Sequence, residues 1–139
     1  MIRRFAAVLA LLAVCATAAA CGRGDKTPQL KEVQHAKSGD LEVVLLAPAD
    51  ALRLGKDQAF LEFRSPAGQL VDVGTVTMNA TMPMAGMPPM MGSSFVNRTN
   101  TTGRYALDTD LSMAGSWRLE ITWNGPAGSG RIMMPGTVR

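Results

Sequence analysis

The sequence predicts an all-β fold, a single β-sandwich of about six or seven short strands. Three observations predict it. Runs rich in β-branched and aromatic residues recur along the chain, Gly and Pro separate these runs, and no helical periodicity follows the apolar N-terminal segment. A small closed barrel is the alternative arrangement of the same strands.

Residues 1–20 have the layout of a secretory signal peptide. Arg3 and Arg4 precede an uncharged stretch over 5–20 that ends in small residues. This stretch is shorter than the roughly 20 apolar residues that a spanning helix needs, and its last part is alanine rather than leucine. A permanent N-terminal anchor helix is therefore the less favoured alternative, and we expect 1–20 to be removed after export.

Cys21 is the expected lipidation site. The residues Ala18-Ala-Ala-Cys21-Gly22 resemble the bacterial lipobox, in which the cysteine is acylated and becomes the new N-terminus. Cys15 follows Val14, which is too bulky for the signal peptidase. Several acyl chains together anchor a protein stably. We therefore expect a protein that is anchored to a membrane through Cys21 and faces the periplasm. Gly22 is not the Asp that commonly signals inner-membrane retention, which favours the outer membrane.

Removal of 1–20 changes the charge balance of the chain. The full sequence has a formal net charge of +3, but the loss of Arg3 and Arg4 leaves 12 Lys and Arg against 11 Asp and Glu. No basic patch stands out, so nucleic acid is not an expected partner. Cys15 is lost and Cys21 carries lipid, so the mature domain is expected to have no disulfide and to depend on its core for stability.

Residues 21–39 read as a flexible tether between the lipid and the domain. Their first part, 22–28, is polar and contains Gly and Pro, and no apolar period follows. His35, the only histidine of the chain, lies in this segment and is expected to be an exposed residue rather than a ligand. The folded domain is expected over 40–139.

The expected strands are short runs between turn residues, at 41–47, 58–64, 71–80, 105–107, 117–123 and 131–134. The clearest pattern is in 117–123, where apolar and polar residues alternate strictly. Its apolar side chains are expected to be buried on one face: Trp117, Leu119, Ile121 and Trp123. Arg118 and Glu120 are expected on the outer face.

Catalysis has little support in the sequence. The expected domain contains no free thiol and no histidine. Asp108 and Asp110 would share one face of a strand, where such carboxylates are usually solvated. No Gly-rich loop joins a strand to a helix, which argues against a phosphate site. We therefore expect no catalytic residues, and a binding protein rather than an enzyme.

One segment, 81–92, carries the most distinctive chemistry of the chain. It holds five of the ten methionines: Met82, Met84, Met87, Met90 and Met91. The expected strands draw on Leu, Val and Ile, so methionine is not simply the default apolar residue. Clustered thioethers suit a soft metal, above all Cu(I), and they bind it without losing a proton. The sequence therefore predicts a Cu(I) site on these five residues.

The spacing of these methionines supports their convergence. Met82 and Met84 would point the same way on an extended chain. A turn at Ala85-Gly86 would then bring Met84 close to Met87. Two other interpretations remain open. The segment could be apolar filler over the open end of the sandwich, or a contact surface for a protein partner.

The order of these features resembles the YtkA-like domain family. The resemblance covers roughly 40–136, and its most specific pieces are Met82-Pro-Met84-Ala-Gly86-Met87 and Met113-Ala-Gly115-Ser-Trp117. Less specific pieces lie at 41–46, 54–63, 66–71 and 103–105. The family is related to FixH-like proteins and often occurs in envelope lipoproteins. The resemblance implies an immunoglobulin-like β-sandwich and an association with copper handling, respiratory-oxidase assembly or metal efflux.

Two classes of function follow from these observations. The first is a copper-binding accessory protein that carries or buffers Cu(I) near the membrane. The second is a non-metal interaction module that docks on an envelope transporter or oxidase through the same segment. Unlike periplasmic Cu(I) carriers that combine His with Met, this chain has no histidine beside its methionines.

Overall fold

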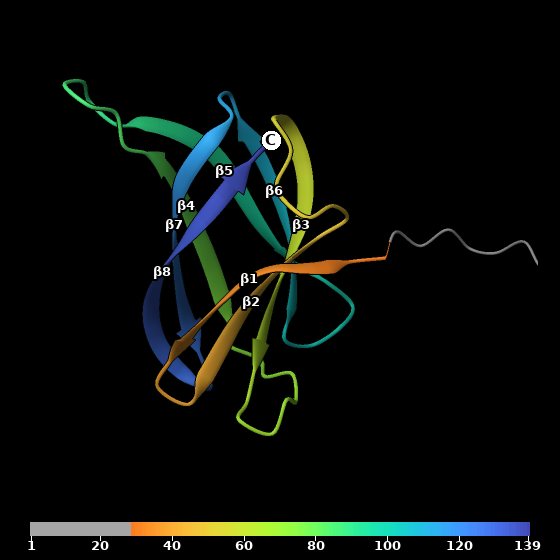
Figure 1. The fold of residues 1–139 in the computed structure, drawn as a ribbon. Coiled ribbons are helices and arrows are strands. Elements are labelled where there is room, and N and C mark those ends of the chain that lie inside the picture. Colours follow the sequence, from red (N-terminus) through yellow and green to blue (C-terminus); the bar gives the residue numbers. More distant parts are fainter. Residues whose placement is uncertain (1–28) are drawn as a thin grey trace, which may run out of the picture.

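The structure is a computed structural model that describes residues 29–139. The expected signal peptide, Cys21 and the first part of the expected tether lie outside these residues. Eight strands build the described part of the chain (Figure 1). They are β1 (Lys31–Ser38), β2 (Leu41–Ala47), β3 (Gly55–Arg64), β4 (Thr75–Met82), β5 (Met90–Arg98), β6 (Arg104–Leu111), β7 (Gly115–Gly125) and β8 (Gly128–Val138). Within 29–139, no helix is long and apolar enough to cross a membrane.

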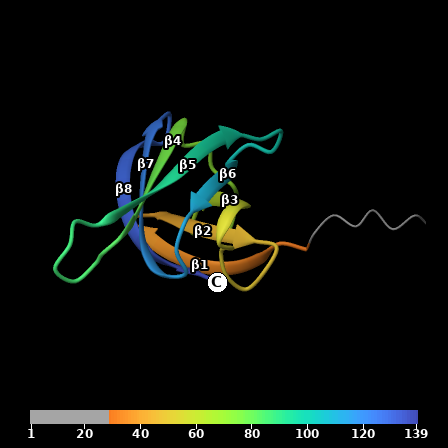
Figure 2. The same ribbon diagram turned by 90° about the horizontal axis from the view of Figure 1, so that it is seen from above.

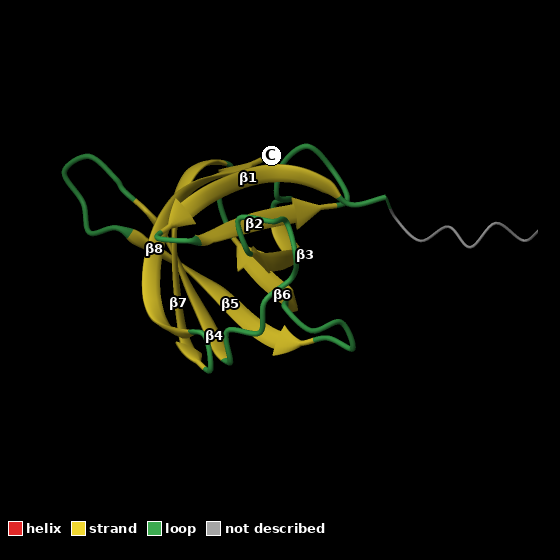
Figure 3. Cartoon of the chain, turned by 90° about the horizontal axis from the view of Figure 1, so that it is seen from below, coloured by secondary structure: helices red, strands yellow, loops and turns green. Residues whose placement is uncertain are grey.

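The strands form one rolled antiparallel sheet in the order β1-β2-β3-β6-β5-β4-β7-β8. Strand β5 joins the two halves of the sheet, because residues 90–92 pair with β4 and residues 93–98 pair with β6. The outer strands β1 and β8 lie against each other, so that the sheet nearly closes on itself (Figures 2 and 3). The all-β prediction is confirmed, in a form between a sandwich and a barrel.

Strand β1 corrects the predicted extent of the tether. The tether was expected to run to Gly39, but residues 31–38 form a strand that pairs with β2. Gly39 and Asp40 make the two-residue connection of this hairpin, a common type. Val33 and Ala36 pack against the core, but polar residues separate them, which hides the strand in the sequence. The sheet therefore begins at Lys31, ahead of the expected boundary at residue 40.

The core lies inside the rolled sheet. All four apolar residues of 117–123 are buried and Arg118 is exposed, as the alternation predicts, while Glu120 is half-buried. Phe63 packs edge-on against the rings of Tyr105 and Trp123, with centroids 5.5 and 5.4 Å away. These aromatic contacts join β3, β6 and β7 across the interior.

Antiparallel pairing places alternate connections at opposite ends of the sheet. The β2–β3, β4–β5 and β6–β7 connections share one end, which we call the hairpin end. Both ends of the described chain also lie there. Lys31 pairs with Ala47, the last residue of β2, and Val138 pairs with Gly115, the first residue of β7. The methionine-rich segment lies at this same end.

Candidate functional site

The methionine-rich segment forms the hairpin between β4 and β5. Met82 ends β4, Met90 begins β5, and the two residues face each other as a cross-strand pair. Met82 continues the inward alternation of Met78 and Ala80, and both Met82 and Met90 are half-buried against the core. Directly opposed residues in antiparallel strands have Cβ atoms about 4.5–5.5 Å apart. Two flexible thioethers can therefore meet over this end of the core.

The tip of the hairpin carries Met84 and Met87. The Met87 N–H donates to the Met84 carbonyl oxygen at 3.5 Å and closes a turn where the sequence predicts one. Gly86 has a φ of 72°, in the left-handed region that glycine adopts without strain. Met84 is half-buried and Met87 is 58% exposed. The tip projects beyond the body of the sheet (Figures 1 and 2).

Met91 lies apart from the other four methionines. It pairs with Thr81 and points to the outer face of β5, with 64% of its surface exposed. Phe95 is exposed on the same outer face. The hairpin thus divides the five predicted ligands into an inward pair at its base, two residues at its tip and one on the outer surface.

The β6–β7 connection lies against the base of the hairpin. The Ser112 hydroxyl donates to the Met90 sulfur at 3.3 Å. A Cβ atom on Gly115 would lie 2.8 Å from the Met82 methyl carbon, and the φ of 134° at Gly115 also favours glycine. Met113, between these two contacts, is 40% exposed, and its carbonyl oxygen accepts a hydrogen bond from Trp117 Nε1 at 2.9 Å.

Two separate sequence motifs therefore meet at the hairpin end. The pieces Met82-Pro-Met84-Ala-Gly86-Met87 and Met113-Ala-Gly115-Ser-Trp117 are far apart in the chain, but Ser112 and Gly115 touch the methionines at the hairpin base. Sequence reasoning did not include Met113 among the candidate ligands. The sequence feature that could have indicated Met113 was its place in the second motif, two residues before β7 begins.

The polar residues of the described chain do not offer a hard-metal site. Residues 29–139 contain no group of three or more His, Cys, Asp or Glu side chains that could hold a metal ion. His35 is exposed, as predicted, but it lies within β1 and its Nδ1 is 2.7 Å from Glu32 Oε1. Strands β2, β3 and β6 separate β1 from β5 on one side of the rolled sheet, and β8 and β7 separate it from β4 on the other, so His35 lies on a strand that pairs with neither strand of the hairpin.

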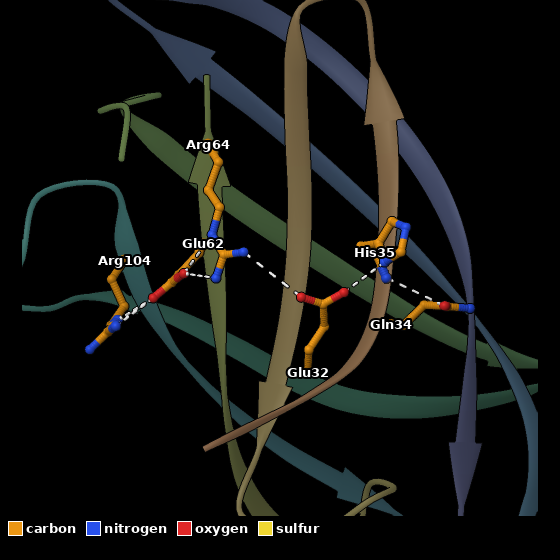
Figure 4. A network of polar contacts seen from close by, with 6 residues as sticks. All are labelled: Glu32, Gln34, His35, Glu62, Arg64 and Arg104. Carbon is orange, nitrogen blue, oxygen red and sulfur yellow. Dashed lines mark hydrogen bonds and ion pairs between the residues drawn. The ribbon is translucent and has the colours of Figure 1, made fainter. Parts of the chain in front are cut away.

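An ion network around the buried Glu62 links β1, β3 and β6 (Figure 4). Glu62 is only 3% exposed and contacts Arg64 at 2.6 Å and Arg104 at 2.5 Å. Arg64 also reaches Glu32 at 3.8 Å. Burial acts to raise the pKa of Glu62, but hydrogen bonds and charge from the two arginines outweigh it and hold that pKa below its usual value. This network fastens the three strands together.

The outer face of β3, β6 and β5 carries a shallow groove beside Phe95. Asp108 and Asp110 lie along it on one face of β6, as the sequence predicts. Asp108 accepts hydrogen bonds from Gln58 at 3.1 Å and Asn97 at 3.3 Å. These contacts are ordinary hydrogen bonds between side chains on the surface of the sheet.

The fold and the hairpin define a class of protein, a small all-β domain with a methionine-rich hairpin at one end. The model of the YtkA-like family matches residues 35–122, and the chain belongs to that family. The matched region contains both motifs that meet at the hairpin end. No curated protein and no solved structure matches the chain.

Proposed function

We propose that this protein binds Cu(I) through thioethers of the β4–β5 hairpin and serves as a membrane-anchored accessory to copper handling, oxidase assembly or metal efflux. The observation that carries the proposal is the cross-strand pair of Met82 and Met90, held half-buried at the hairpin end. Its role is binding, and no catalytic step is assigned to it.

The chemistry of the hairpin selects the oxidation state of the metal. Thioethers are soft ligands that favour Cu(I), whereas Ca²⁺ and Mg²⁺ require oxygen ligands. Met84 and Met87 at the tip can supply further sulfur. Met91 points to the opposite face of β5, so we leave it out of the proposed inner site.

The proposed location combines the N-terminal sequence with the place where the sheet begins. Residues 1–20 and Cys21 favour export and lipidation, and Gly22 favours the outer membrane over the inner one. The ten residues from Cys21 to Lys31 span at most about 35 Å when fully extended. Because Lys31 lies at the hairpin end, the methionines would stay within reach of a partner at the membrane surface, such as an oxidase or efflux component.

A second candidate function is a docking module that binds no metal. It is favoured by the apolar surface that Met87, Met91 and Phe95 leave exposed on the tip and outer face of the hairpin. Such a surface suits a protein partner whether or not the inward methionines hold copper.

An anaerobic Cu(I) titration against a competing chelator separates these two functions. The whole protein, purified in detergent, is compared with a variant carrying Met82→Leu and Met90→Leu, which conserves volume and packing. Met133→Leu is the control, because Met133 is exposed on β8, away from the hairpin. We expect the double variant to bind Cu(I) at least about tenfold more weakly and the control to match the unchanged protein. An unchanged protein that cannot hold Cu(I) against a weak chelator rejects the copper function and leaves the docking module.

A further inference from the structure

The residue between the two contacts at the hairpin base is itself a methionine. Ser112 touches the Met90 sulfur, and Gly115 lies under the Met82 methyl group. Met113 stands between Ser112 and Gly115 in the β6–β7 connection. We propose that Met113 is a third thioether ligand of the copper site and that the site lies at the hairpin base, over the end of the core. This inference rests on the proposed function.

The backbone of Met113 is fixed, and Met113 is not among the residues that pack against the core. The indole N–H of the buried Trp117 holds the Met113 carbonyl oxygen at 2.9 Å. The side chain of Met113 stays 40% exposed, and Ser112 and Ala114 beside it are exposed as well. Because the backbone is already held, only the side-chain torsions of Met113 remain to be ordered when its sulfur binds a metal.

Ser112 and Gly115, which lie on either side of Met113 in the chain, contact the other two proposed ligands. A thioether sulfur has two lone pairs, and the Ser112 hydroxyl engages only one of those on Met90. The other lone pair remains free for a metal. On the opposite side, the absence of a side chain at Gly115 leaves room for the Met82 methyl group. The Met82 sulfur is therefore also held beside the β6–β7 connection.

This arrangement places three sulfurs on three different segments of the chain: the end of β4, the start of β5 and the β6–β7 connection. A site of neutral thioethers suits Cu(I) or Ag(I) and discriminates against divalent cations that need charged or oxygen ligands. Met84 and Met87 then form an outer pair at the tip, separate from the inner three.

Methyl NMR of the whole protein in detergent tests the assignment directly. The protein is labelled with ¹³C at the methionine methyl groups and titrated with Ag(I), a soft ion of similar preference. Signals are assigned from single Met→Leu variants. We expect the Met82, Met90 and Met113 signals to shift together at one equivalent of Ag(I). The Met133 signal should stay in place, because Met133 lies outside the hairpin end.

Measurements of Cu(I) affinity provide a second test of Met113 as a ligand. Met113→Leu should weaken binding about tenfold or more while Met133→Leu has no effect. The melting temperatures of both variants should equal that of the unchanged protein, because both side chains are exposed.

The possible outcomes separate the two proposals. If Met82 and Met90 shift with Ag(I) while Met113 stays in place, and Met113→Leu binds Cu(I) normally, the inference is wrong and the proposed function stands. If no methionine shifts and the unchanged protein holds no Cu(I), both proposals fail.

Discussion

At the scale of single residues, Glu62 shows how much a charge can contribute to an all-β core. It is the only charged side chain among the buried residues of 29–139. Both of its oxygens are engaged, one by Arg64 and the other by Arg104. Nothing in the alternation of β3 signals this burial, because an outward glutamate on a strand is ordinarily solvated. The burial depends on arginines that the register of β3 and β6 brings alongside.

We expect Glu62→Gln to lower the free energy of unfolding at pH 7. Removing one partner of a buried ion pair costs about 3–5 kcal/mol, and the partial exposure of both arginines should reduce this to about 2–3 kcal/mol. Denaturant unfolding followed by circular dichroism measures the loss. Glu120→Gln is the control, because the ion pair that Glu120 makes is a single, longer one, at 3.8 Å from Arg131. An equal loss in both variants would mean that the Glu62 network contributes no more to the free energy of unfolding than the Glu120–Arg131 contact does.

The pH dependence of this effect has a definite sign. The pKa of Glu62 is lower in the folded protein than in the unfolded chain, so its stabilisation is complete above the unfolded value of about 4.3. The stabilisation is lost as the pH falls through the folded pKa, where the carboxylate becomes protonated. The difference between the unchanged protein and Glu62→Gln should therefore be constant near neutral pH and shrink in acid.

At the scale of the elements, local pattern predicted the strands whose apolar residues alternate or run together. Strand β7 follows its predicted alternation, and β2 occupies the predicted residues 41–47. Strand β5 was missed because its inward positions include Gly92 and Ser94, which carry no hydrophobic signal. The Ser94 hydroxyl instead donates to the Met78 carbonyl oxygen of β4. Such a strand is specified by its neighbours rather than by its own sequence.

The candidate site could likewise be predicted only in part from the local sequence, because the rest depends on which strands pair. Composition alone identified the methionine cluster, and the turn at Ala85-Gly86 was readable from residue types. The inward direction of Met82 and Met90 depends on the register of β4 with β5. The place of Met113 depends on the topology that sets the β6–β7 connection beside that hairpin. Neither fact is available without the three-dimensional arrangement.

Replacing Met84 and Met87 together by Leu tests whether the base or the tip of the hairpin holds the metal. If the base is the inner site, this double variant should lose only a few-fold in Cu(I) affinity, less than the variant that lacks Met82 and Met90. The competition titration gives both values, and a greater loss at the tip would contradict a site at the base. For both the unchanged protein and the tip variant, affinity should differ little between about pH 5 and 7, because methionine does not titrate there.

At the scale of the whole molecule, the rolled sheet gathers the functional features at one end. The hairpin, the β6–β7 connection and the start of β1 all lie at the hairpin end. Figure 2 shows the start of β1 and the projecting hairpin on opposite sides of the rim. If Cys21 is lipidated as proposed, the segment before β1 would hold this end of the sheet near the membrane. Fold and proposed location are connected through β1, a strand whose sequence has the polar pattern of a tether.

We expect Cys21→Ser to abolish lipidation without affecting the fold. Every strand of the described residues 29–139 lies after residue 30, so the circular dichroism spectrum and melting temperature of the domain should be unchanged. The intact mass of protein extracted from the envelope should show acyl chains on the unchanged protein and none on the variant, which should persist as an uncleaved or mis-cleaved precursor. Cys15→Ser is the matched control, because Val14 makes Cys15 a poor acceptor and its loss should leave processing and acylation intact. A Cys21→Ser protein with the same mature mass and membrane association as the unchanged one would show that the chain is not anchored at Cys21. The distance limit set by the ten residues before β1 would then no longer apply, and the proposed reach to a partner at the membrane surface would lose its basis, whereas Cu(I) binding at the hairpin would be unaffected.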